Sequence, residues 1–390
     1  MTSSPKNIIL ANRVQHITPS ATLAITARAA ELKKQGVDVI SLAAGEPDFN
    51  PPEVFLEGLH HAITAKRFTY TPVSGIKELK DALITKFAAQ GMEYEQKNIS
   101  ISCGAKHALF NICMSLFEVG DEVLIPKPYW VSYPEMVKLA GATPVFVEAV
   151  DYVVTAASIE QAITPKTKAV IINSPSNPSG AVIPRDELLN IAEVAKRHNL
   201  LIISDEIYEH IMYEGQHISI ASLSEDALQR TLVVNGFSKS HAITGLRLGY
   251  VAGSAVYIGA INNLQSHSTS NPTSIVQYAA LSCVTPPEAF LSQACIAYKK
   301  RRDIALAALE RIPGVSCRKP EGAFYLFPKI PQQDDITCAR ELLEQAHVAV
   351  VPGSEFGMPG HLRISYATDE ASLAIGLERL SAFFSAQNVQ

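Results

Sequence analysis

The feature that most constrains the fold of this chain is an alternation of short apolar runs with longer segments of helical periodicity. The runs are rich in β-branched residues, and five of them read DEVLIP, KAVIINS, LLIISDE, TLVVNG and LGYVAG. Continuous apolar strands separated by helices are typical of a mostly parallel sheet with helices on both faces. The pattern therefore predicts an α/β fold, a three-layer sandwich around a mostly parallel central sheet.

The pattern changes near Pro287. A long helical segment follows, and then α+β segments that contain GAFYLFP, VAVVPGSEFG and HLRISYAT. We expect a large domain over residues 50–286 and a smaller α+β domain over residues 287–390. The N-terminal segment, residues 1–49, has a helical pattern of its own and is expected to join the smaller domain.

Composition excludes several classes of protein. Of the 390 residues, 47% are hydrophobic and 18% are charged, which is ordinary for a globular protein, and the net charge of −5 comes with no basic block. Nucleic acid is therefore not an expected partner.

The six cysteines have no CxxC spacing and are expected to be reduced thiols. The eleven histidines form no HExxH-like pattern, so no metal site is expected. The apolar N-terminal stretch is interrupted by Asn12 and Arg13, so we expect no signal peptide, no membrane span and a cytoplasmic protein.

Polar side chains follow three of the predicted strands, where ligands bind in parallel sheets. Asn177 lies in the turn after one strand, Asp205 and Tyr208 follow the next, and Lys239 follows a third. Taken singly, the asparagine is typical of a turn, the aspartate of a helix cap and the lysine of a solvated surface. Their convergence at one edge of the sheet favours a binding site.

These residue types suit pyridoxal 5′-phosphate. This cofactor needs an amine for a Schiff base, an acid beside its pyridine nitrogen and a polar partner for its phenolate. Its phosphate needs backbone N–H donors at a helix N-terminus and a cation. Gly104 and Ala105, at the strand-to-helix turn in SCGAKHALF, and Arg247 supply both.

Over essentially its whole length, the chain resembles the class I aminotransferases of pyridoxal phosphate fold type I. The matching motifs are SLAAGEPDF, YTPVSGIKELKDAL, GDEVLIPKPYWVSYPEM, NSPSNPSG, SDEIYE, NGFSKSHAITGLRLGYVAG, EGAFYLFP and LRISYAT. The chain is most similar to the bacterial aspartate aminotransferases that lack the animal-type distal arginine. The resemblance implies ping-pong transfer of the amino group from L-aspartate to 2-oxoglutarate, giving oxaloacetate and L-glutamate. It also implies a homodimer with shared active sites, and a large domain that binds the cofactor.

The resemblance assigns a role to each candidate residue. It implies that Lys239 forms the Schiff base, that Asp205 pairs with the pyridine nitrogen and that Tyr208 and Asn177 bind the 3′ oxygen. The other implied cofactor contacts are Trp130, stacked on the ring, and four phosphate ligands: Gly104, Ala105, Arg247 and Tyr70 from the second subunit. The implied substrate contacts are Arg363, Asn177 and Gly45 at the α-carboxylate, Trp130, and Lys106 at the distal carboxylate. Lys106 could instead be a solvated lysine or a further phosphate ligand.

Two departures from the family pattern and several alternatives stay open. Many relatives carry serine where this chain has Gly236, which puts one phosphate contact in doubt, and prephenate-active members often carry lysine in place of Thr18. A fold type I lyase, such as a carbon–sulfur lyase, would use the same lysine, aspartate and tyrosine. An aminotransferase with broader, aromatic or prephenate substrates is a second alternative. A regulator built on an aminotransferase domain would need a DNA-binding extension, for which the short N-terminus leaves no room.

Overall fold

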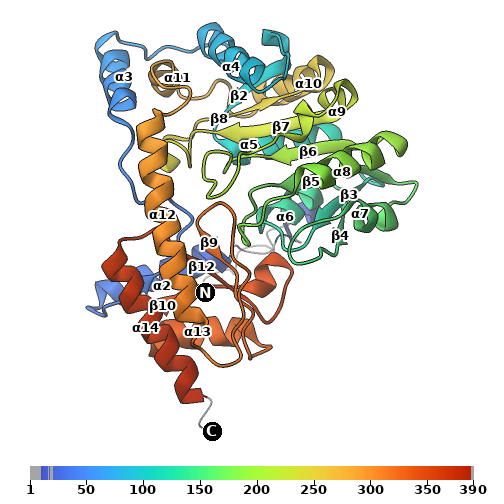
Figure 1. Cartoon of the computed structure of the whole chain (residues 1–390). Coiled ribbons are helices and arrows are strands. Elements are labelled where there is room, and N and C mark those ends of the chain that lie inside the picture. The colour runs from blue at the N-terminus through green and yellow to red at the C-terminus, as the bar shows by residue number, and fades with distance from the viewer. Residues whose placement is uncertain (1–9, 16, 18–20, 388–390) are drawn as a thin grey trace, which may run out of the picture.

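The protein is represented by a computed structural model that describes residues 10–15, 17 and 21–387. Its centre is a seven-stranded sheet with the strand order β2-β8-β7-β6-β5-β3-β4 (Figure 1). Strand β8 is antiparallel to its neighbours β2 and β7, and the other neighbouring strands are parallel. The strands are β2 (Ile99–Ser102), β3 (Glu122–Pro126), β4 (Thr143–Val147), β5 (Thr167–Asn173), β6 (Leu201–Asp205), β7 (Thr231–Gly236) and β8 (Gly249–Ala252). The mostly parallel sheet predicted from the apolar runs is confirmed.

Helices cover both faces of this sheet, because its strands are apolar on both sides. On β3, Val123 and Ile125 belong to one hydrophobic cluster and Leu124 belongs to another, and all three side chains are fully buried. The first cluster is closed by α5 (Ala105–Leu116), α6 (Ser132–Leu139) and α10 (Ala255–Ser266). The second is closed by α7 (Ala156–Ala162), α8 (Arg185–Arg197) and α9 (Glu225–Arg230) (Figure 1). Alternate residues of one strand thus face opposite layers, as the period of a strand requires.

A third cluster covers the sheet near β2 and β8. It is formed with α3 (Glu53–Thr64), α4 (Lys77–Ala89) and α11 (Ser274–Ala280), and α3 packs directly on α11. Ile99 and Ile101 of β2 are fully buried beneath these helices. This cluster closes the end of the sheet that carries the antiparallel strand.

The C-terminal part contains two small sheets beside three long helices. Strand β12 (Leu362–Ser365) is flanked by β9 (Tyr325–Leu326) and β11 (Val351–Pro352), both antiparallel to it. The N-terminal strand β1 (Ile40–Ser41) pairs in parallel with β10 (Val348–Ala349). The helices are α12 (Glu288–Leu309), α13 (Asp335–Gln345) and α14 (Glu370–Gln387), and α12 runs between the two parts of the molecule (Figure 1).

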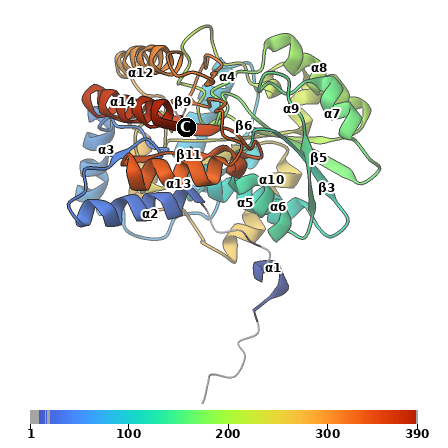
Figure 2. The same ribbon diagram turned by 90° about the horizontal axis from the view of Figure 1, so that it is seen from below.

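The N-terminal residues pack against this C-terminal part. Besides the pairing of β1, helix α2 (Ala21–Lys34) lies beside α13 (Figure 2). It buries Ala29 and Leu32 in one cluster with Phe327 and Val351. The remaining described helix, α1 (Asn12–Gln15), is short and exposed. We propose the domain division expected from the sequence: a large domain over residues 50–286 and a small domain formed by residues 287–390 with the segment 1–49.

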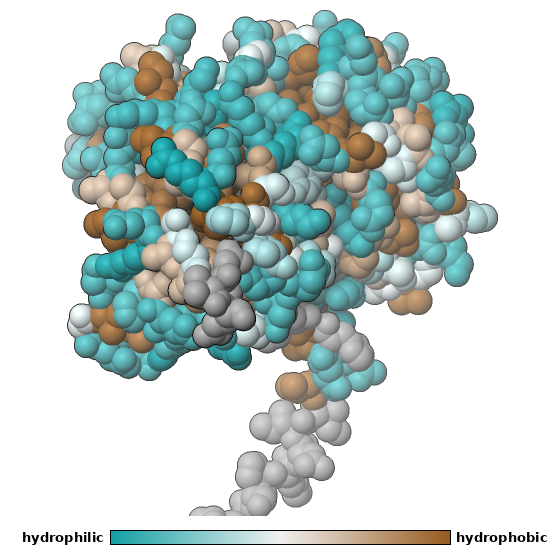
Figure 3. All heavy atoms as spheres, turned by 60° about the horizontal axis from the view of Figure 1, so that its bottom comes forward, coloured by the Kyte–Doolittle hydropathy of each residue, from teal (hydrophilic) through white to brown (hydrophobic). Residues whose placement is uncertain are grey.

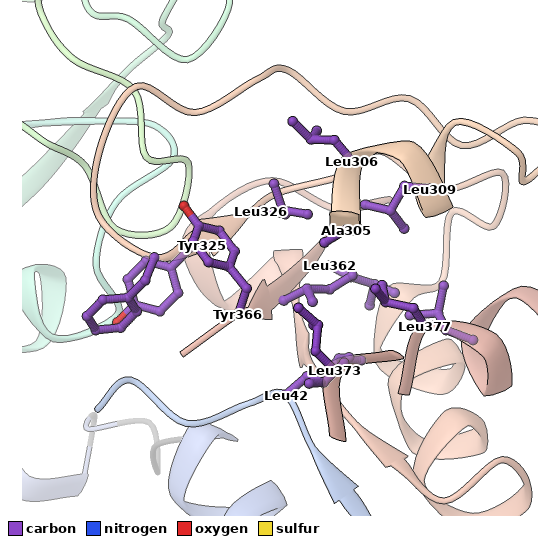
Figure 4. Close-up of a cluster of buried hydrophobic side chains, with 14 of the residues drawn as sticks. Leu42, Ala305, Leu306, Leu309, Tyr325, Leu326, Leu362, Tyr366, Leu373 and Leu377 are labelled. Carbon is purple, nitrogen blue, oxygen red and sulfur yellow. The ribbon is translucent and has the colours of Figure 1, made fainter. Parts of the chain in front are cut away.

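The C-terminal part has its own hydrophobic core, in which Leu42, Tyr325 and Tyr366 pack among side chains of α12 and α14 (Figure 4).

The outer surface in Figure 3 is mostly hydrophilic, with hydrophobic residues in separate groups. Within the described residues, every helix is too short or too polar to cross a membrane. All six cysteines are free, as the sequence predicted.

Candidate active site

The predicted strand-end residues meet at one edge of the sheet. Strands β5, β6 and β7 are parallel neighbours, with Asn173 opposite Asp205 in the pairing register. Asp205 is the last residue of β6, Asn177 lies in the loop after β5, and Lys239 follows β7. The structure therefore brings together the polar side chains that the sequence placed at strand exits.

Asp205 is a buried carboxylate with a phenol as its partner. Its Oδ2 accepts a hydrogen bond of 2.7 Å from the Tyr133 hydroxyl, and its Oδ1 accepts one of 3.3 Å from the amide of Ile207. Burial raises the pKa of Asp205 to about 6, although the Tyr133 hydrogen bond and the positive charge of Lys239 act in the opposite direction. A cation beside this carboxylate would therefore be strongly stabilised.

Lys239 is held in a way that favours a neutral amine. Its Nζ donates to the backbone carbonyl of Gly45 and lies 5.9 Å from the ring centre of Phe324. Burial lowers the pKa of Lys239 to about 8; the carboxylate of Glu46 opposes this change, and the charges of nearby cations, including Arg247, add to it. An amine with this pKa is partly unprotonated near neutral pH, which a nucleophile or a general base requires.

Arg363 connects the C-terminal part to the strand-end loops. Its Nη1 donates to Asn177 Oδ1 at 3.1 Å, and its Nη2 donates to the carbonyl of Ala43 at 2.7 Å. The guanidinium lies over the rings of Tyr325 and Phe356, at 4.6 and 5.1 Å from their centres. Arg363 is 3% exposed and its Nε has no hydrogen-bond partner. A buried donor without a partner is costly, so this side chain is suited to binding an anionic ligand.

The N-terminus of α5 lies close to Arg247 and to strand β8. Gly104, the N-cap residue, has a φ of +86°, and a Cβ added there would lie 2.6 Å from Arg247 Nη2. Gly249 is equally constrained, since a Cβ on it would lie 2.3 Å from the amide nitrogen of Ala105. The glycines thus allow β8, the helix N-terminus and Arg247 to approach one another, and the free N–H groups of a helix N-terminus favour an anion.

Lys106 lies beside the ring of Trp130. The Lys106 Nζ lies 4.7 Å from the centre of the Trp130 ring, which is a cation–π distance. Lys106 and Arg247 line a cavity of about 820 Å³, together with residues of α6. Burial and the charge of Arg247 lower the pKa of Lys106. Lys106 is nevertheless an exposed residue. A carboxylate bound beside Lys106 and Arg247 would relieve the repulsion between the two cations.

Tyr70 is the one sequence candidate that lies apart from this group. It follows α3 in an exposed loop, and its side chain is 90% exposed. Gly236, where many relatives carry serine, ends β7 against β8: a Cβ there would lie 3.0 Å from the backbone of both Leu248 and Gly249. A side chain at position 236 would therefore require these strands to move apart.

Sequence reasoning missed two hydroxyl groups at the site. Tyr133 was not singled out, although it lies on α6 three residues after Trp130, and its hydroxyl contacts Asp205. Tyr325 lies in the motif EGAFYLFP, and its hydroxyl lies 2.8 Å from that of Tyr208. Neither contact could be derived from the sequence, because both join segments that are distant in the chain.

Behind Asp205 and Tyr208 lies a buried charged network. Glu206, Glu209 and His217 offer possible metal-ligating atoms within 4.8 Å of one another. Their carboxylates already have protein partners: Ser204 and Ser219 donate to Glu206 at 2.8 and 2.7 Å, and Lys86 forms an ion pair with Glu209. This pairing holds the pKa of Glu209 well below its usual range. The network fixes the loop that carries Asp205 and Tyr208, and the absence of a metal stays a prediction.

Comparison with known proteins identifies the family. The family model described as aminotransferase class I and II matches residues 37–380. This chain belongs to the class I and II aminotransferases. The family predicted from the motifs is confirmed, and the enzyme is a transaminase of a pyridoxal-phosphate-dependent family.

The aminotransferase has close relatives over almost its whole length. The aspartate aminotransferase of Geobacillus stearothermophilus is 49% identical over 390 residues, which cover 97% of this chain and 99% of that protein. The aspartate/prephenate aminotransferase of Thermus thermophilus is 43% identical, over 95% and 98% of the two chains. A solved structure of Thermus thermophilus aspartate aminotransferase with maleate has a TM-score of 0.93 at 42% identity, covering 96% of this chain and all of that chain. The fold is that of these aminotransferases, as the sequence predicted.

Proposed function

We propose that this aminotransferase uses pyridoxal 5′-phosphate to transfer the amino group of L-aspartate to 2-oxoglutarate, giving oxaloacetate and L-glutamate. One observation carries the proposal: Lys239, whose pKa is lowered to about 8, lies near the buried carboxylate of Asp205. The same site contains the buried Arg363, whose Nε has no hydrogen-bond partner. The lysine and the aspartate suit the cofactor, and the arginine suits the carboxylate that every amino acid substrate carries. The names of the relatives support aspartate as the substrate.

The residues present fit the proposed cofactor. Lys239 would carry it, Asp205 would pair with its ring nitrogen, and Tyr208 and Asn177 would bind its phenolic oxygen. Trp130 would stack on the ring. The phosphate would bind at Gly104, Ala105 and Arg247. Glycine is needed at position 104, because a Cβ there would collide with the Arg247 guanidinium. The donor set thus matches an anionic phosphate at one end and a basic ring nitrogen at the other.

When bound, the cofactor supplies an electron-accepting ring for the electrons left as the substrate loses its Cα proton. The chain supplies the other functions. Asp205, whose pKa burial raises to about 6, is stabilised as a carboxylate by a proton held on the ring nitrogen. Lys239 Nζ takes the proton from the substrate Cα as a general base, and then donates it as a general acid. Because one product leaves before the second substrate binds, ping-pong kinetics are expected.

Two cations would select the substrate. Arg363 would bind the α-carboxylate with Asn177 and the Gly45 backbone, since its Nη1 already reaches Asn177 at 3.1 Å. Lys106 would bind the distal carboxylate of aspartate or 2-oxoglutarate from the cavity that it lines. Because an ammonium is a less directional partner than a guanidinium, we expect moderate preference for dicarboxylates and slow reaction of some neutral amino acids.

The alternatives differ in substrate or in the fate of the amino group. A fold type I lyase would release ammonia or cleave a side-chain bond instead of transferring nitrogen, and a cationic partner for the distal carboxylate, such as Lys106, favours the transferase. Prephenate and aromatic substrates are the second alternative. Thr18, where prephenate-active members often carry lysine, lies outside the described residues.

We propose that the active unit is a homodimer in the cytoplasm, with Tyr70 reaching the phosphate site of the second subunit. The loop after α3 supports this: Tyr70 is 90% exposed, and the neighbouring apolar residues Phe68 and Ile63 are 61% and 50% exposed. Aromatic residues are enriched at protein interfaces, and exposed groups of this kind often mark them. A monomer would leave these side chains and the Tyr70 hydroxyl in water.

A panel assay tests the proposal. The purified protein with added pyridoxal phosphate is given 2-oxoglutarate and each of aspartate, alanine, phenylalanine and cysteine, and both glutamate and oxo acid are measured. The proposal predicts equal amounts of oxo acid and glutamate, fastest with aspartate. Oxo acid formed with free ammonia or sulfide and without glutamate would show a lyase instead.

A further inference from the structure

Two tyrosines from different parts of the chain share a hydrogen bond beside the proposed cofactor site. Tyr208 follows β6, Tyr325 begins β9, and their hydroxyl oxygens are 2.8 Å apart. Both side chains are buried, at 3% and 1% exposure. The bond therefore joins the loop after β6 to strand β9 of the C-terminal part.

The position of the Tyr325 hydroxyl is fixed by its surroundings. Strand β9 pairs with β12, which carries Arg363, and the Arg363 guanidinium lies 4.6 Å from the centre of the Tyr325 ring. On the other side, a Cβ at Gly45 would lie 2.9 Å from the hydroxyl oxygen. The hydroxyl thus lies between Tyr208, the glycine whose carbonyl accepts from Lys239, and the proposed α-carboxylate site.

Proton counting distinguishes two arrangements of this pair. Each phenol has one proton and can accept through its lone pairs, so only one of the two hydroxyls donates to the other. If Tyr208 donates to Tyr325, it has no proton left for a further acceptor. If Tyr325 donates, the Tyr208 proton is free for the cofactor's phenolic oxygen, and a hydrogen bond to an anionic oxygen is the stronger one.

The charges around the pair favour the second arrangement. Burial raises the pKa of Tyr208 well above its ordinary value, with Tyr325 adding to the rise. Burial also raises the pKa of Tyr325, and the Arg363 cation and the hydrogen bond to Tyr208 oppose that rise. The Arg363 guanidinium lies 4.6 Å from the centre of the Tyr325 ring, and a cation beside a phenol makes its hydroxyl the better donor, so we take Tyr325 as the donor of the pair.

We propose that Tyr325 is a positioning residue: it donates its proton to Tyr208 and so directs the Tyr208 proton to the phenolic oxygen of the cofactor. The proposal rests on the pyridoxal phosphate function proposed above and adds a residue to which the sequence motifs gave no role. Tyr325 acts only through Tyr208. Tyr325 also packs against Arg363. One side chain therefore contacts both Tyr208, which would bind the cofactor, and Arg363, which would bind the substrate α-carboxylate.

A spectrophotometric pH titration of the cofactor-loaded protein tests this role without measuring turnover. Donation from Tyr208 stabilises the anionic oxygen and so favours the unprotonated form of the Lys239–cofactor linkage, which lowers the midpoint pH of its absorbance change. Tyr325→Phe should raise this midpoint by about half a pH unit, which corresponds to the loss of one ordinary hydrogen bond. Tyr208→Phe should raise it further, and the double variant should match Tyr208→Phe alone, because the effects of coupled residues do not add.

Tyr366→Phe is the matched control. The Tyr366 hydroxyl forms a similar buried pair with that of Tyr213, at 2.9 Å in the same hydrophobic core, and also lies 3.4 Å from the carbonyl of Ala323. Its removal should leave the midpoint unchanged. If Tyr325→Phe does not retain the cofactor, a ring-fluorinated tyrosine at position 325, a more acidic donor, should lower the midpoint instead.

Two outcomes would overturn the inference while leaving the proposed function intact. One is a midpoint that Tyr325→Phe or the fluorinated residue leaves unmoved while Tyr208→Phe shifts it. The other is additive shifts in the double variant, which would mean that Tyr325 acts independently of Tyr208. A parent protein without any cofactor absorbance band would overturn the proposed function and this inference with it.

Discussion

The Tyr133 hydroxyl donates a 2.7 Å hydrogen bond to the carboxylate of Asp205, and both side chains are buried between α6 and the end of β6. Burial raises the pKa of Asp205 to about 6, and the Tyr133 bond limits that rise. Without a cation beside it, the ionised form of this carboxylate is therefore costly in the folded protein.

The first prediction concerns the stability of the protein without cofactor. The folded-state pKa of Asp205 lies above the ordinary value of 3.8, so the folded protein binds this proton more tightly than the unfolded chain does. The stability that Asp205 contributes is therefore present below about pH 4 and is lost as the pH rises through about 6. Relative to Asp205→Asn, the free energy of unfolding should fall by about 3 kcal/mol over this window. Urea titrations of both proteins at several pH values measure the difference. A difference that stays constant with pH would contradict the raised pKa, and Tyr133→Phe should move the window to higher pH.

The second prediction concerns Arg363. A lysine cannot reproduce the fork that contacts Asn177 and Ala43 on one side and a substrate carboxylate on the other. Arg363→Lys should lower kcat/KM by about 2–3 kcal/mol of transition-state binding, equally for aspartate and alanine, since both carry an α-carboxylate. A loss seen only with dicarboxylates would place Arg363 at the distal carboxylate instead.

The third prediction concerns Lys106. Lys106→Ser should lower kcat/KM for aspartate and glutamate by about 1–3 kcal/mol and leave alanine and phenylalanine nearly unchanged. Lys138→Ser is the control, because Lys138 lines the same cavity but is paired with Glu135 at 2.9 Å. Equal losses for all four substrates, together with weaker cofactor retention, would show that Lys106 serves the phosphate.

The fourth prediction tests the shared site. Tyr70→Ala and Lys239→Ala homodimers should each have little activity, but mixing them under subunit exchange should restore part of it, because one site of each hybrid then contains both native residues. Lys239→Ala mixed with Asp205→Ala is the control and should recover nothing, since each chain disables its own site. Confirmed exchange without recovery in the first mixture would mean that Tyr70 does not act across the interface.

The sequence predicted the parallel sheet and its strand-end residues because both depend on local patterns. Val123, Leu124 and Ile125 make both faces of β3 apolar, Asp205 ends β6, and Lys239 lies in the loop after β7. The contacts of Tyr133 and Tyr325 could not be predicted, since a buried phenol in a helix or strand carries no sign of its partner. Likewise, the lowered pKa of Lys239 results from burial among charges from distant segments.

Transfer of a labelled nitrogen atom tests the central claim most directly. The protein with pyridoxal phosphate is incubated with L-aspartate labelled in its amino nitrogen and unlabelled 2-oxoglutarate, and the products are measured by mass spectrometry. We predict labelled L-glutamate in equal amount to oxaloacetate, no transfer by Lys239→Ala, and release of little labelled ammonia. Labelled ammonia in place of labelled glutamate, or transfer that persists in Lys239→Ala, would contradict the account.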